Sequence, residues 1–135
     1  GELGFVGVLA SVVGLGAAGL ELAADEQRRA FAAAKPGALM NVGLWAWCRH
    51  PNYLGEITFW VSLWLFGVAA SPGDAWWTAL GPVSILALFL RASIPLIEER
   101  NAARRPGWDA YVASTPRLWP RPPKGGGADT EEAGR

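Results

Sequence analysis

The chain has 135 residues, of which 51% are hydrophobic and only 18% are charged, and it contains eight tryptophans. Its formal net charge of zero gives no electrostatic reason to expect nucleic acid as a partner. The single cysteine, Cys48, excludes an internal disulfide framework and a cysteine-based zinc site, and we expect no metal site of another kind. The charges fall into a few blocks separated by long uncharged runs, a layout typical of integral membrane proteins.

The first uncharged run, Leu3 to Leu20, is long enough to predict a membrane-spanning helix. Its many glycines and alanines would weaken a helix in water, but in lipid they allow neighbouring helices to approach closely. The charged stretch from Glu21 to Arg29 extends this helix, and Lys35-Pro36-Gly37 predicts the turn that ends the extension.

Two more uncharged runs follow, Ile57 to Gly73 and Ala75 to Leu90, with a tight turn predicted at Ser71 to Asp74. Both runs are a little short for a full span, so we expect flanking residues to extend them or the helices to be slightly tilted. The sequence therefore predicts an all-α integral membrane helical bundle of about three transmembrane helices, forming one domain over residues 1–124. The Gly- and charge-rich residues 125–135 are expected to form a disordered tail.

Basic residues predict the orientation of the bundle. They lie between the first and second runs and again after the third, whereas the turn between runs two and three has none. The positive-inside rule then places the middle segment and the tail together in the cytosol, in the endoplasmic reticulum membrane if the source is eukaryotic and in the inner membrane if it is bacterial. A water-soluble cofactor would bind where these two segments meet.

The stretch from Gly43 to Glu56 holds the only histidine of the chain, His50, beside Arg49. Pro51 suits the first turn of the second membrane helix, and the position just before a helix N-terminus favours anions such as phosphates. Asn52 and Glu56 are four residues apart and share a helix face, and Gly55 between them permits close approach of another backbone. The alternative is an ordinary interfacial cap, in which Arg and His reach the headgroups and Tyr53 anchors the boundary.

Two further groups of charged residues are candidates for a site. Glu21, Asp25 and Arg28 or Arg29 follow one another at helical spacing, although intrahelical ion pairs on a solvated helix end would look the same. Glu98 and Glu99 precede a basic stretch that runs from Arg100 through Arg105 to Tyr111. These side chains could contact a ribose and phosphates, or they could form a solvated helix face.

The motif Gly-Leu-Trp-Ala-Trp-Cys-Arg-His-Pro-Asn-Tyr-Leu-Gly-Glu at 43–56 resembles the signature of the steroid 5α-reductase C-terminal domain family, in particular its bacterial and algal branch, DUF1295. The stretches 91–100, 105–111 and 115–123 are similar to the tail of the same branch. The resemblance runs from about Glu21 to Lys124.

This resemblance implies an all-α membrane fold whose cytosolic face holds NADPH. By position, Asn52 and Glu56 match family residues that contact the cofactor, and Asp25 matches an acidic contact. The signature and the tail align further residues, and the full set of expected cofactor-binding positions is Asp25, Arg29, Arg49, His50, Asn52, Tyr53, Glu56, Glu98, Glu99 and Tyr111. The resemblance does not indicate a catalytic residue in this chain. The family's N-terminal helices, which complete the substrate site, have no counterpart here, and the first residue is Gly1, so we expect a chain that is part of a longer protein.

The leading hypothesis is NADPH-dependent reduction of an activated C=C bond in a steroid-like or lipid-like substrate, with Arg49 and the pair Arg28 and Arg29 as candidate phosphate contacts. No Gly-rich fingerprint follows a strand, so a Rossmann domain is not expected. One alternative is an S-adenosylmethionine-dependent methyltransferase of the isoprenylcysteine type, because those enzymes share an Arg-His-Pro-x-Tyr-x-Gly stretch and a downstream pair of glutamates. A non-catalytic membrane scaffold is the other.

Overall fold

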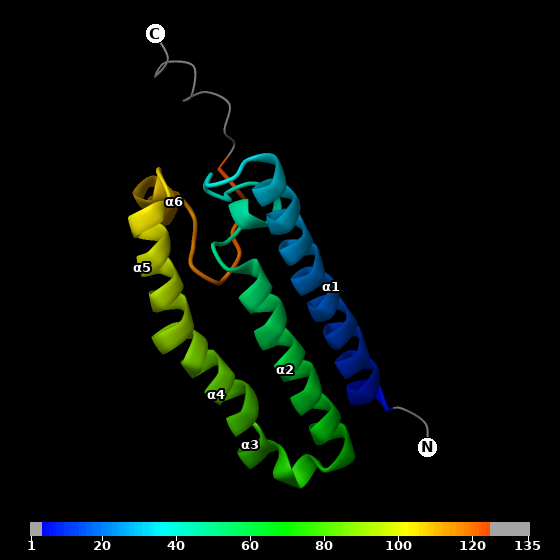
Figure 1. Ribbon diagram of the computed structural model, residues 1–135. Helices are drawn as coiled ribbons and strands as arrows, with labels where there is room; N and C mark the ends of the chain where they lie inside the picture. Colours follow the sequence, from blue (N-terminus) through cyan, green and yellow to red (C-terminus); the bar gives the residue numbers. More distant parts are fainter. Residues whose placement is uncertain (1–3, 125–135) are drawn as a thin grey trace.

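The computed structural model describes residues 4–124 and contains only helices and turns in that range (Figure 1). The prediction of an all-α bundle is therefore confirmed. Three helical stretches, Phe5–Ala34, Pro51–Ala70 and Pro72–Arg104, are long and apolar enough to cross a membrane. The expected tail at 125–135 lies outside the described residues. The elements, in chain order, are α1 (Phe5–Ala34), the 3-10 turn η1 (Gly43–Ala46), α2 (Pro51–Ala70), the 3-10 turn η2 (Pro72–Asp74), α3 (Ala75–Thr78), α4 (Leu80–Leu88), the π-helical segment η3 (Phe89–Ser93), α5 (Ile94–Arg104) and α6 (Trp108–Ser114).

Helix α1 is continuous from the apolar run into the charged stretch and ends at Ala34, where the Lys35-Pro36-Gly37 turn was expected. The carbonyl of Lys35 accepts a hydrogen bond from the Ala38 N–H at 3.2 Å, and Gly37 has a φ of +80°. This geometry is that of a Pro-Gly turn, in which the third position needs a left-handed backbone that glycine supplies without strain.

Helices α1 and α2 pack against each other along their lengths through small residues. On α1 the buried positions follow at intervals of three, four or seven residues and are Gly7, Ala10, Gly14, Ala17 and Ala24. On α2, the buried Ser62 hydroxyl donates a hydrogen bond to the Ala10 carbonyl at 2.9 Å. A Cβ at Gly55 would lie 2.9 Å from the Glu21 backbone nitrogen, so only glycine allows this approach. The small residues of the first run therefore serve helix packing, as in other membrane bundles.

The third spanning stretch is interrupted at two prolines. The break between α3 and α4 lies at Ala79, three residues before Pro82, and the π-helical segment η3 directly precedes Ile94 and Pro95. Proline cannot donate a backbone hydrogen bond and its ring crowds the preceding turn, so the helix breaks or widens there. Helical structure nevertheless continues through Arg91 to Arg104. The third spanning stretch is therefore longer than its apolar run, as we expected from the short length of that run.

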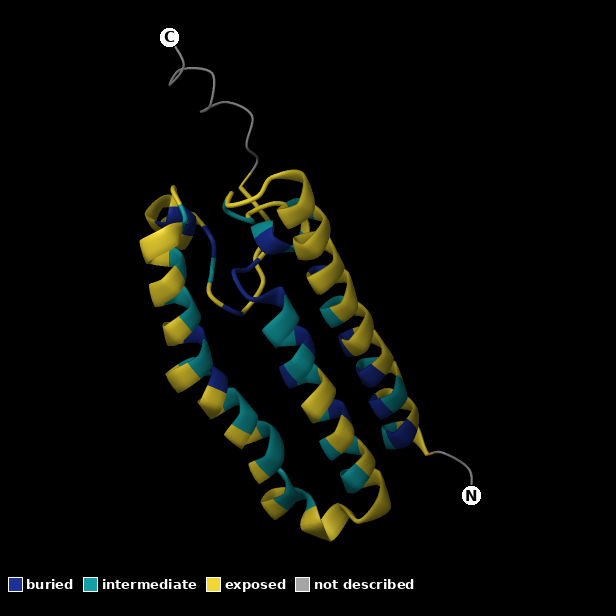
Figure 2. Cartoon of the chain, viewed as in Figure 1, coloured by how far each residue is buried: buried dark blue, intermediate teal, exposed yellow. Residues whose placement is uncertain are grey.

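The polar segments meet at one end of the bundle, and the turn between α2 and α3 lies at the other (Figure 1). A cluster of buried apolar residues connects three helical elements with the segment after α6: Ile57 of α2, Phe89 of η3, Ile94 of α5 and Leu118. Outer helix faces are largely exposed and carry large apolar side chains, as expected for surfaces that face lipid (Figure 2).

Candidate functional site

A pocket of about 100 Å³ opens at the polar end of the bundle. Its walls come from the end of α1, the Pro-Gly turn that follows, the start of α2, the end of α5 and helix α6. Aromatic side chains and hydrogen-bonding groups share the lining, and the polar members include Arg28, Arg49, Asn52, Tyr53, Asn101 and Arg105. The meeting of the middle segment and the tail that the sequence predicted is therefore confirmed, although the side of the membrane on which it lies is still a prediction.

A second Pro-Gly turn shapes the far wall of this pocket. The Arg105 carbonyl accepts a hydrogen bond from the Trp108 N–H at 3.3 Å, and Gly107 has φ +82° and ψ 7°. Proline in the second position and a left-handed glycine in the third are the signature of a type II turn. The turn ends α5 and starts α6, and it places Arg105 and the buried Trp108 on the pocket.

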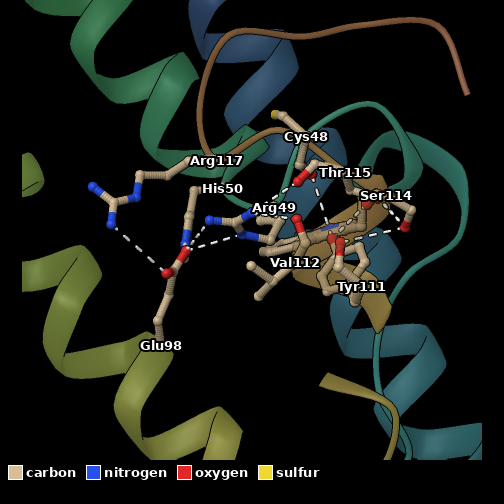
Figure 3. Close-up of polar contacts among 10 residues, drawn as sticks. Cys48, Arg49, His50, Glu98, Tyr111, Val112, Ser114, Thr115 and Arg117 are labelled. Atoms are coloured by element: carbon tan, nitrogen blue, oxygen red, sulfur yellow. Dashed lines mark hydrogen bonds and ion pairs between the residues drawn. The ribbon is translucent and has the colours of Figure 1, made fainter. Parts of the chain in front are cut away.

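Behind the pocket, four titratable residues form a polar cluster around one carboxylate: Arg49, His50, Glu98 and Arg117 (Figure 3). One Glu98 carboxylate oxygen accepts hydrogen bonds from Arg49 Nε at 3.0 Å and lies 2.9 Å from a terminal guanidinium nitrogen of Arg49. The same oxygen lies 3.0 Å from His50 Nε2, and Arg117 approaches the other oxygen at 3.9 Å. Only 7% of the Arg49 side chain and 15% of the Glu98 side chain are exposed. The cluster therefore joins the start of α2 to α5 through a largely desolvated pair of charges.

Arg49 also binds the end of α6 and the residues just after it. Its remaining terminal nitrogen donates hydrogen bonds to the Thr115 carbonyl at 2.8 Å and to the Val112 carbonyl at 3.3 Å, and its backbone N–H donates to the Pro116 carbonyl at 2.9 Å. All three nitrogens of the guanidinium thus have partners within the chain. Guanidinium is the side chain best suited to satisfy several acceptors in a buried site.

His50 caps the start of α2 and begins an aromatic stack. Its ring lies 5.5 Å from that of Tyr53 at an interplanar angle of 13°, and Tyr53 lies 4.5 Å from Phe89 at 15°. Burial lowers the pKa of His50 and outweighs the opposing effect of Glu98, while the positive charges of Arg49 and Arg117 act in the same direction as burial. The ring is therefore neutral near neutral pH, and a proton on Nε2 would be donated to Glu98.

The Tyr111 and Trp45 side chains connect α6, η1 and α1. The Tyr111 hydroxyl donates to the Trp45 carbonyl, and the Trp45 indole nitrogen donates to the Ala24 carbonyl at 3.0 Å. Burial raises the pKa of Tyr111, so the hydroxyl remains a donor across the physiological range. The Arg28 guanidinium lies over the Trp45 ring, 5.7 Å from its centroid. This contact is a cation–π interaction that fixes Arg28 at the edge of the pocket.

The acidic residues on α1 and α2 lie beside the pocket. Glu56 and Asp25 are close enough to Glu21 for their charges to interact, and the same two carboxylates act on the Tyr53 hydroxyl. Asn52 lines the pocket, and its side-chain oxygen accepts the Tyr53 backbone N–H at 3.0 Å. Asn52 and Glu56 are both half-buried.

Five of the ten expected cofactor-binding residues line the pocket together: Arg49, His50, Asn52, Tyr53 and Tyr111. Asp25 and Glu56 lie beside it, and Glu98 lies behind Arg49 and His50. Two others are directed elsewhere, because Arg29 forms an exposed ion pair with Glu26 at 2.6 Å and Glu99 is exposed outside the pocket lining.

Three polar residues of the pocket were not among those ten: Arg28, which was named only as a candidate phosphate contact, Asn101 and Arg105. Asn101 carries no sequence signal beyond its place in a polar helix. Arg105 stood in the basic stretch of the tail, and recognition of Arg105-Pro106-Gly107-Trp108 as a type II turn could have separated it from its neighbour Arg104.

Comparisons with known proteins identify a family and one relative for this chain. A protein-family model described as "Protein of unknown function (DUF1295)" matches residues 1–115. An uncharacterized protein of Schizosaccharomyces pombe is 34% identical over 79 residues, which is 58% of this chain and 23% of the relative. The matched segment thus spans about a quarter of the relative's length. No solved structure matches the chain at a significant level. Because the family match covers most of its length, the chain belongs to the DUF1295 family.

Proposed function

We propose that this chain forms the NADPH-binding end of a membrane reductase that reduces an activated C=C bond in a steroid-like or lipid-like substrate. The observation that carries the proposal is the pocket with arginine, asparagine and tyrosine side chains at the polar end of an otherwise apolar bundle. Such a position is accessible both to a water-soluble cofactor and to a substrate dissolved in the bilayer.

The composition of the pocket suits a dinucleotide. Arg28 and Arg105 supply positive charge for phosphates, and Asn52 and Asn101 supply amides that can both donate and accept hydrogen bonds. Trp45 and Trp108 supply flat apolar surfaces on which a ring can stack. When bound, NADPH would provide the hydride, and these side chains would bind and orient it.

The size of the pocket limits what this chain can do on its own. Its volume of about 100 Å³ is well below the ~300–1,000 Å³ of typical small-molecule sites. This pocket can therefore enclose one part of a dinucleotide, and a second, more open pocket of about 450 Å³, which shares Leu39 and Tyr111 with it, offers room for a further part. This is consistent with the expectation that a complete substrate site requires helices beyond this segment.

The main alternative, an S-adenosylmethionine-dependent methyltransferase, rests on the Arg-His-Pro-x-Tyr-x-Gly stretch and the pair Glu98 and Glu99. In the structure, Glu98 pairs with Arg49 and contacts His50, and Glu99 lies outside the pocket. S-adenosylmethionine carries a positive sulfonium, which a pocket edged by Arg28 and Arg105 would repel. Asp25 and Glu56 lie beside the same pocket, so the preference for the reductase over the methyltransferase rests on these two arginines of the lining itself.

Ligand binding tests the proposal directly. The chain would be reconstituted in nanodiscs of phosphatidylcholine, and NADPH and S-adenosylmethionine would be titrated separately by calorimetry. Tryptophan emission provides a second signal, because Trp45 and Trp108 line the pocket and transfer energy to a nearby reduced nicotinamide.

We expect saturable binding of NADPH that weakens about tenfold in Asn52→Ala, from the loss of a buried hydrogen bond and of a group that orients the ligand. Thr58→Ala is the matched control, since Thr58 is half-buried on the same helix as Asn52 and is absent from the pocket lining. Binding of S-adenosylmethionine alone would establish the methyltransferase. A protein that binds NADPH equally well with and without Asn52 would sink the assignment of this pocket, and failure to bind either ligand would favour a scaffold.

A further inference from the structure

The pocket contains three arginines, but they are not equivalent. Arg49 lines it, yet its guanidinium already contacts Glu98 and the carbonyls of Thr115 and Val112. Recruitment of Arg49 by a ligand would break the buried pair with Glu98 and release the tail, which is energetically expensive. Arg49 therefore positions the walls of the pocket and is unavailable to a phosphate.

Arg28 has the opposite character. It is exposed at the end of α1, and among residues 4–124 no carboxylate pairs with it in a salt bridge. Its guanidinium is held over the ring of Trp45, which is itself fixed by a hydrogen bond to the Ala24 carbonyl. A cation held in place in this way loses little side-chain entropy when it binds an anion. The adjacent Arg29 differs, because its charge is paired with Glu26 outside the pocket.

Arg105 supplies the second available cation, from the other side. The type II turn at Arg105-Pro106-Gly107-Trp108 fixes its backbone, and the side chain is half-buried in the pocket lining. Within the described range it also has no salt-bridge partner. Helix α1 and the α5–α6 turn lie on either side of the start of α2 (Figure 1), and Arg28 and Arg105 belong to these two elements and line the same pocket.

We propose that Arg28 and Arg105 form a two-sided clamp for a phosphate-ester group, while Arg49 takes no part in binding it. The proposal rests on the proposed function only in naming NADPH as the source of this group. Two guanidiniums from separate elements that line one pocket suit a diphosphate, because each can donate two parallel hydrogen bonds to one phosphate. In a dinucleotide, the diphosphate is the part that this pair of arginines would hold.

The test uses inorganic pyrophosphate and NADPH as probes, titrated by calorimetry into the protein in phosphatidylcholine nanodiscs. Arg28→Ala and Arg105→Ala should each weaken both probes about tenfold, and the double variant about a hundredfold. Arg29→Ala and Arg104→Ala are the matched controls, because each removes an adjacent exposed arginine outside the pocket lining and should change affinity by less than about twofold. Arg28→Lys and Arg105→Lys should recover part of the affinity, which guards against a variant that fails to fold.

The outcomes separate the clamp from the reductase proposal. Binding of pyrophosphate through Arg28 and Arg105 without binding of NADPH would support the clamp and reject the reductase. NADPH affinity that is unchanged in both alanine variants would overturn the clamp and leave the reductase standing. No binding of either probe to folded wild-type protein would also overturn it. In nanodiscs that contain phosphatidylglycerol, loss of pyrophosphate binding would assign the two arginines to lipid headgroups and overturn the pocket clamp.

Discussion

Glu98 connects the start of α2 to α5, and the consequence of removing its charge can be worked out from the structure. Glu98→Gln preserves the shape of the side chain and one acceptor oxygen but leaves Arg49, whose side chain is 7% exposed, without its counter-charge. Breaking one partner of a buried ion pair costs about 3–5 kcal/mol. Because glutamine still accepts a hydrogen bond from Arg49, we expect the lower end, about 3 kcal/mol of unfolding free energy.

The measurement is the free energy of unfolding from SDS titration in mixed micelles, followed by tryptophan emission. Glu99→Gln is the matched control, since Glu99 is the next residue on the same helix and is exposed; we expect a change within about 0.5 kcal/mol. Equal stabilities of the two variants would refute the reasoning that the Glu98 carboxylate maintains a buried charge. A selective loss of ligand binding in Glu98→Gln with unchanged stability would instead make Glu98 a ligand contact.

Three further predictions concern packing, protonation and a buried hydrogen bond. Gly55→Ala should destabilise the fold by about 1–3 kcal/mol, because the added Cβ would lie 2.9 Å from the backbone of α1. The control Gly67→Ala lies on the same helix, and its Cβ would meet nothing within 4 Å. In the same unfolding assay it should be neutral or stabilising by up to ~1 kcal/mol. The lowered pKa of His50 means that the unfolded chain binds the proton more tightly than the folded chain does. The contribution of the neutral His50 ring to stability is therefore complete above about pH 6.5 and is lost as the pH falls through the folded-state pKa, by at most ~1.4 kcal/mol per pH unit. In unfolding titrations across this pH range, His50→Gln should lose that dependence of stability on pH. Tyr111→Phe should cost about 1 kcal/mol, because the Trp45 carbonyl loses a buried donor, with helix content by circular dichroism unchanged.

The elements of the fold could be predicted from sequence because each has a local cause. The length of the apolar runs determined the spans, Lys35-Pro36-Gly37 marked the end of α1, and Pro51 is at the first turn of α2 as expected. The interruption at Phe89–Ser93 was not predicted. A proline inside an apolar run indicates that the helix is irregular nearby. The π-helical segment, however, carries Phe89, which stacks on Tyr53 of α2, and this contact between residues distant in sequence could not be predicted from the local sequence.

The roles of the charged residues could be predicted only in part, because a motif shows which residues gather but not which of them remain available. Arg49 and His50 were expected at the site, and both line the pocket. Their side chains, however, hydrogen-bond to Glu98, which is about fifty residues away in the sequence. Helical spacing likewise could not decide between Arg28 and Arg29, since both follow Asp25 on the same turn. The decision rests on Trp45, whose ring lies under one of them.

The division of labour among the arginines has a mechanical consequence for the pocket. Helices α1 and α5 lie on opposite sides of α2, and the Glu98 cluster fixes α5 only to the start of α2 and the tail. Under our proposal, an anion held by both Arg28 and Arg105 would add a link between α1 and the end of α5. A ligand that binds only the folded arrangement stabilises it in proportion to the logarithm of its concentration over its dissociation constant. The two groups of arginines would thus have different roles. Arg49, paired with Glu98, fixes α5 to the start of α2, and Arg28 and Arg105 would connect α1 to the end of α5 through the bound anion.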